Sequence, residues 1–127
     1  MYMTDQHREA IQAVATILNG TMTGGISDNY VYINFDDGRS IGFFMGSDAK
    51  DKAKICCHYP KMNGRELRLM DFNSTDAHSP CIKSSLTKSP KAIAGDIQRK
   101  VLPEYDVLFK EAVEYAERTT AHQLMHR

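Results

Sequence analysis

Residues 30 to 45 read YVYINFDDGRSIGFFM, and this stretch decides the fold. The run from Tyr30 to Phe35 is rich in β-branched and aromatic residues, which favour β-strands. Asp36-Asp37-Gly38 is a turn sequence, and the chain returns through a second apolar run at residues 41 to 45. The stretch therefore predicts an antiparallel hairpin at the centre of a sheet.

The two faces of this hairpin differ in character, because successive side chains of a strand point to opposite faces. One face carries the apolar side chains at residues 31, 33 and 35 and is expected to join the core. The other face carries Tyr30, Tyr32 and Phe44. We expect a helix to cover these rings; stacking on a base or docking of a second subunit are the alternatives.

The rest of the chain adds a helix before the hairpin and further strands after it. Apolar residues at helical spacing predict a helix over residues 4–19, with Thr4 or Asp5 as its cap and Asn19-Gly20 as its end. A loop is expected over residues 21–29 and a longer polar loop over residues 71–80. Further strands are predicted over residues 53–59, 65–70 and 82–86.

A second helix begins at Ser89-Pro90, where Ser is a favourable cap and Pro a favourable first residue. Its apolar stripe runs from Ile93 to Tyr115, and Pro103 should kink it or divide it before an end near Thr119. The predicted class is thus α+β, with an N-terminal helix, an antiparallel sheet of four to five strands and a long kinked C-terminal helix. Part of that helix extends past the sheet, so we expect a homodimer or higher homo-oligomer.

Composition sets wide limits on function. The 127 residues form one expected domain, residues 1–127, with 16 basic and 16 acidic residues, so bulk charge indicates no partner. Charged residues near the start argue against a signal peptide, and no apolar run is long enough to cross a membrane. Three cysteines, two of them adjacent, do not form a disulfide framework, and we expect a reducing cytoplasm.

The start of the second helix is the most cationic part of the chain. Residues 82–101 contain five Lys or Arg side chains and a single acidic one, Asp96. Free N–H groups at a helix start favour anions. We therefore expect a phosphate-bearing ligand at Lys83, Ser85, Thr87, Lys88, Ser89, Lys91, Arg99 and Lys100. The alternative is an ordinary capped helix start in solvent.

Catalysis and metal binding receive less support from the sequence. Cys56 and His58 share one face of a predicted strand, but no third group or nucleophile motif accompanies them. Cys57 points the other way, and His78 and Cys81 have no zinc-site spacing with them. We expect no enzyme, no bound metal and no cofactor.

The run IKSSLTKSPKAIAGDIQRKVLPEY, residues 82 to 105, resembles a segment of small proteins of phages and other mobile elements. The resemblance covers about a fifth of the chain. It implies an accessory protein that counters host defence, and within that group the anti-Thoeris proteins sequester cyclic ADP-ribose signals without cleaving them. The residues that align with such a role are Lys88, Ser89, Lys91, Arg99 and Lys100.

The expected function is therefore sequestration of a nucleotide signal by a non-enzymatic protein in the host cytoplasm. Two alternatives use other partners. One is inhibition of a host defence complex by protein–protein contact. The other is nucleic-acid binding, in which sheet aromatics stack on bases and lysines follow the phosphates.

Overall fold

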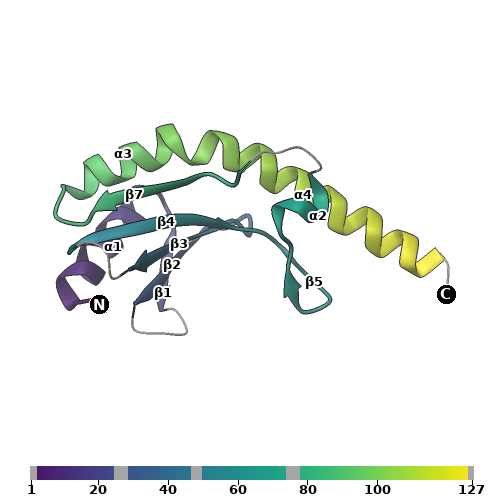
Figure 1. Cartoon of the computed structure of the whole chain (residues 1–127), viewed down its shortest axis with the longest axis horizontal. Helices are drawn as coiled ribbons and strands as arrows, with labels where there is room; N and C mark the ends of the chain where they lie inside the picture. The colour runs from purple at the N-terminus through teal and green to yellow at the C-terminus, as the bar shows by residue number, and fades with distance from the viewer. Residues whose placement is uncertain (1–2, 25–28, 47–49, 74–77, 126–127) are drawn as a thin grey trace.

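One antiparallel sheet of five strands forms the centre of the protein, in the order β1-β2-β3-β4-β7. The structure is a computed structural model and describes residues 3–24, 29–46, 50–73 and 78–125. The sheet strands are β1 (Thr21–Gly24), β2 (Tyr30–Asn34), β3 (Ser40–Met45), β4 (Lys52–His58) and β7 (Cys81–Ser85). The helices are α1 (Asp5–Ile17), α2 (Leu69–Phe72), α3 (Pro90–Lys100) and α4 (Leu102–Met125). Figure 1 shows α3 and α4 as one bent run above β7, and the predicted α+β class is confirmed.

The N-terminal helix begins as the sequence predicts. The Thr4 hydroxyl accepts the His7 N–H, and the Thr4 N–H donates to His7 Nδ1 at 3.1 Å. This reciprocal cap satisfies two donors at the helix start. The other ring nitrogen of His7 lies 2.6 Å from a carboxylate oxygen of Asp51, so α1 is tied to the turn before β4. The helix ends where Asn19 takes a left-handed φ of 59°.

The core lies between the sheet and the apolar faces of the helices. The sheet contributes aliphatic and aromatic side chains from alternate positions of β2, β3 and β4. The helices α1, α3 and α4 contribute apolar side chains that recur every three to four residues. Residues with no exposed surface include Val31, Ile33, Ile41, Phe43, Met45, Ile55, Ile11, Val14, Ile93, Ile97, Val101 and Tyr105. No helix of the described residues is both long enough and apolar enough to span a membrane.

The long C-terminal helix is divided where the proline indicated. α3 ends with Val101 as its cap, and Pro103 is the second residue of α4, where a missing N–H costs little. α4 continues to Met125, past the predicted end at Thr119. Figure 1 shows its C-terminal part running beyond the sheet, and Ala112 is its last buried residue among those described.

Three further local predictions are wrong. The predicted loop over residues 21–29 contains β1, which pairs with β2. The predicted strand over residues 65–70 is reduced to β6 (Arg65–Glu66), which pairs with β5 (Lys61–Met62) in a small hairpin, and α2 follows. The rings expected beneath a helix are not covered by one in the described structure: α1, α3 and α4 pack on the opposite face, and Phe44 is 37% exposed.

Candidate functional site on the open sheet face

The predicted basic helix start is compensated within the chain. The Ser89 hydroxyl accepts the Ala92 N–H as the helix cap, and the hydroxyls of Ser85 and Thr87 lie 2.7 Å apart. Groups that bond to one another in this way need no ligand to satisfy them.

The cations of this region are also partly compensated. The Asp96 carboxylate lies 2.8 Å from the Arg99 guanidinium and 3.6 Å from the Lys88 ammonium. A carboxylate between these two cations occupies the kind of place that a phosphate would take. Asp96 thus partly neutralises the positive charge that the sequence placed at this helix start.

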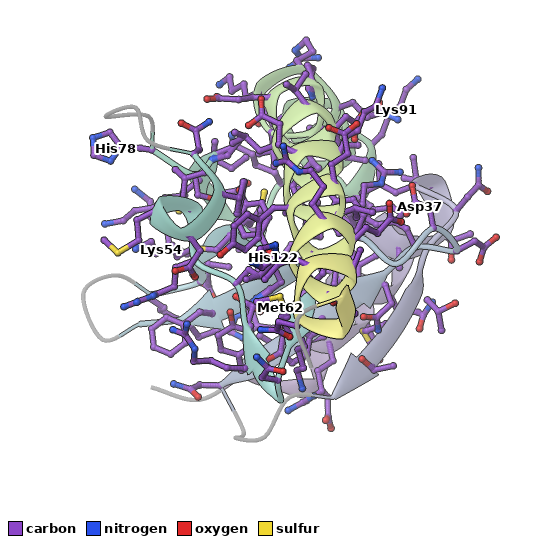
Figure 2. All side chains as sticks on the ribbon, turned by 90° about the vertical axis from the view of Figure 1, so that its right-hand side faces the viewer. Asp37, Lys54, Met62, His78, Lys91 and His122 are labelled. Carbon is purple, nitrogen blue, oxygen red and sulfur yellow. The ribbon has the colours of Figure 1, made fainter. Side chains whose placement is uncertain are left out.

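The predicted residues are spread over β7, the turn after it and the length of α3. Lys91 and Lys100 are exposed on α3, whereas Lys83 lies on β7 and belongs to the sheet. Figure 2 shows Lys91 and the sheet residue Lys54 on different sides of the molecule. Of the predicted set, Lys83 and Ser85 lie two residues apart on β7 and so belong to the surface described next.

We call the sheet surface opposite the helices the open face. Strand register places its side chains in two rows that run across β2, β3, β4 and β7. The first row is Tyr30, Phe44, Lys54 and Lys83, and the second is Tyr32, Gly42, Cys56 and Cys81. His58 follows Cys56 on the same face, because it lies two residues further along β4.

The β2–β3 side of the open face carries a cluster of rings. Tyr30 lies 4.9 Å from Tyr32 and 5.7 Å from Phe44 between ring centroids, and all three are half-buried or exposed. The Tyr32 ring is also 5.2 Å from the His58 ring, edge to face. Rings at these separations attract one another, so the cluster is held together before any ligand arrives.

A hydrogen-bonded series fixes the edge of this cluster. His58 Nδ1 lies 2.9 Å from a carboxylate oxygen of Glu66, and His58 Nε2 lies 2.9 Å from the Tyr30 hydroxyl. A carboxylate only accepts, so Nδ1 donates to Glu66, and the second ring nitrogen bonds with the Tyr30 hydroxyl. Burial raises the pKa of Tyr30 to about 12, and the nearby Tyr32 contributes to this rise. The Tyr30 hydroxyl therefore keeps its proton and remains a donor. The β5–β6 hairpin supplies Glu66 and so positions Tyr30.

Gly42 makes room for these two rings. A Cβ on Gly42 would lie 2.6 Å from the Tyr30 ring and hydroxyl and 2.7 Å from His58 Nε2. Contacts this short do not occur between real side chains, so any larger residue would displace the rings. Gly42 thus allows Tyr30 and His58 to meet across β3.

The β4–β7 side of the open face is cationic. Lys54 and Lys83 are exposed and stand directly opposite each other in the antiparallel register. Their Cβ atoms are then about 5 Å apart, a spacing at which like charges destabilise a strand pair. The register thus brings two cations together on this side of the open face.

Two thiols lie beside the lysines, because Cys56 follows Lys54 on β4 and Cys81 precedes Lys83 on β7 by two residues. Cys56 Sγ is 3.2 Å from Cys81 Sγ, which is the closest polar partner of Cys56 that the structure shows. Cys57 is buried on the opposite face, with its thiol 3.5 Å from the Pro80 carbonyl. The described residues contain no group of three potential metal ligands.

Sequence reasoning missed Lys54, Glu66 and Cys81 as members of one surface. The alternation KAKICCH over residues 52–58 places Lys54 beside Cys56 and His58 on one face. This shared face could have been predicted from the sequence. The contributions of β7 and of the hairpin depend on long-range pairing. No family model, curated protein or solved structure matches this chain.

Proposed function

We propose that the open face binds single-stranded nucleic acid, with bases on the aromatic side and phosphates on the lysine side. One observation carries the proposal: the sheet register aligns Tyr30 and Phe44 in the same row as Lys54 and Lys83. Aromatic rings accept the face of any base, and lysines attract phosphate without regard to sequence. Base stacking on sheet aromatics is also a general mode of single-stranded RNA recognition.

The dimensions of the row fit an extended strand. From β2 to β7 the row of side chains crosses three strand spacings, or about 14 Å in all. Small ligands instead favour concave sites that enclose most of their surface. A row of rings and cations that extends over four strands therefore supports a polymer more than an enclosed nucleotide signal.

Sequestration of a nucleotide signal at the basic helix start has less support, because Asp96 already pairs with Lys88 and Arg99. A nucleotide and a nucleic acid share the same chemistry, a base and a phosphate. Competition with adenosine monophosphate and with cyclic ADP-ribose separates the two ligands. We expect a short oligonucleotide to stay bound when either competitor is added at millimolar concentration.

The test measures fluorescence anisotropy of labelled oligothymidine and oligouridine at several salt concentrations. Two phosphate contacts to a single strand give a slope of about −1.4 for log K against log salt. We expect the double variant Lys54→Ala, Lys83→Ala to reduce that slope to near zero and to weaken binding.

The matched control is the double variant Lys91→Ala, Lys100→Ala, which removes the same charge from α3. The proposal predicts wild-type binding for this control. Equal losses in both double variants would indicate a response to net charge alone and would overturn the assignment to the open face. Absence of binding by the wild-type protein at low salt would reject the function itself.

A further inference from the structure

Two cysteines from distant parts of the sequence meet on the open face. Cys56 on β4 and Cys81 on β7 are direct register partners, and their sulfur atoms are 3.2 Å apart. Cys81 is exposed and Cys56 is half-buried, so solvent reaches the pair from the Cys81 side.

The backbone already has the spacing that a disulfide requires. Directly opposed residues of an antiparallel pair have Cα atoms about 4.5 or 5.5 Å apart. Both values lie within the range of about 4.4–6.8 Å that disulfides adopt. Closing the sulfur atoms to bonding distance takes about 1.2 Å, which side-chain rotation can supply without moving the strands.

We propose that Cys56 and Cys81 form a reversible disulfide by exchange with a low-molecular-weight disulfide, oxidised glutathione being the probe. The Cys81 thiolate attacks one sulfur of oxidised glutathione and displaces a glutathione thiolate, which leaves a mixed disulfide on Cys81. Cys56 then loses its proton to solvent and attacks the Cys81 sulfur, releasing the second glutathione. Two protein thiols are oxidised, and one glutathione disulfide is reduced to two thiols.

The order of attack follows from exposure. Burial, with the hydrogen bond to Cys81, raises the pKa of Cys56 to about 12, which makes its thiolate scarce. The exposed Cys81 is therefore the entry point and Cys56 the resolving thiol. Cys57 takes no part, because it is buried on the other face.

Oxidation would join the edge strand β7 to β4 covalently. The bond closes a loop from residue 56 to residue 81, which contains the β5–β6 hairpin and α2. A loop of this length constrains the unfolded chain, so the oxidised protein should melt roughly 5–15 °C above the reduced protein. The two lysines of the open face form the neighbouring pair on the same strands, two residues from this bond.

The test incubates the full chain with oxidised glutathione and then alkylates it with iodoacetamide before intact-mass analysis. Oxidation should remove about 2 Da and lower the number of alkylated thiols from three to one. Peptide mapping without reduction should find Cys56 joined to Cys81, and dithiothreitol should restore all three thiols. The matched control Cys57→Ser should lose both of its remaining thiols in the same way.

Cys81→Ser should show no 2 Da loss, and its exposed position makes the substitution compatible with folding. The proposal is overturned if the wild-type thiols stay reduced at excess oxidised glutathione, if glutathione stays attached to Cys81, or if mapping joins Cys56 to Cys57. None of these measurements uses nucleic acid, so their outcome is independent of the binding experiment.

Discussion

Replacing Tyr105 with Phe removes a single hydroxyl that α4 inserts at the end of the β3–β4 ladder. The Tyr105 ring has no exposed surface, and its hydroxyl accepts the Ser40 N–H at 2.9 Å. The same hydroxyl lies 2.5 Å from the His58 carbonyl oxygen, to which it donates. Ser40 and His58 are register partners, so Tyr105 joins both strands to the helix where His58 enters the open face.

The expected cost follows from the two backbone groups that lose a partner. Phe fills the same volume, so no cavity forms and the loss is polar. An orphaned buried donor or acceptor costs about 1–3 kcal/mol, and Ser40 is only half-buried, which favours the lower part of that range. We expect the free energy of unfolding to fall by about 2–3 kcal/mol, and Tm by roughly 6–12 °C for a chain of this size.

Urea denaturation followed by far-ultraviolet circular dichroism measures this change. Tyr115→Phe is the matched control, since it removes a hydroxyl from the same helix that has no hydrogen-bond partner within the described structure. The control should lie within about 0.5 kcal/mol of the wild type. A Tyr105→Phe protein as stable as the control would refute the role given to the hydroxyl.

Two further predictions concern the open face and the buried phenols. Gly42→Ala should lower the free energy of unfolding by about 1–3 kcal/mol in urea denaturation, because the added Cβ would overlap the Tyr30 and His58 rings. Without such an overlap, Ala in a strand is more stable than Gly. A gain in stability would therefore contradict the packing described. Burial raises the pKa of Tyr30 and Tyr59 to about 12, so between pH 10 and 12 the folded chain holds more protons than the unfolded chain. The free energy of unfolding should therefore fall as pH rises through that window, and urea midpoints unchanged from pH 9 to pH 11 would argue against buried, protonated phenols.

Local sequence signals account for much of the fold. The hairpin turn is present, with Gly38 at a φ of 93° that favours glycine. Ser89 and Pro90 begin α3 as expected, and Pro103 marks the division from α4. In each case one residue type fixes the backbone within a few residues, so no distant contact is needed to predict it.

The alternation over residues 65–70 was misleading for a local reason. Leu67 is buried as a strand pattern would require, but the Arg68 N–H donates to the Asp71 carboxylate at 2.7 Å. This contact caps a short helix and ends the strand early. Two competing local signals were present, and periodicity alone cannot rank them.

The site could be predicted only in part. The rings of β2 and β3 were visible in the hairpin, but the partners of Lys54 and Cys56 lie on β7, more than twenty residues away in sequence. A shift of register by one residue would point those side chains into the core. The pairing is fixed by the packing of the whole sheet, which no local pattern contains.

The most direct test of the open face is a two-dimensional ¹⁵N–¹H spectrum recorded during titration with unlabelled oligothymidine. We expect the largest shift changes on the strand residues Tyr30, Phe44, Lys54 and Lys83, with small changes along α3. Changes concentrated between Ser89 and Lys100, or no changes at saturating oligonucleotide and low salt, would contradict this expectation.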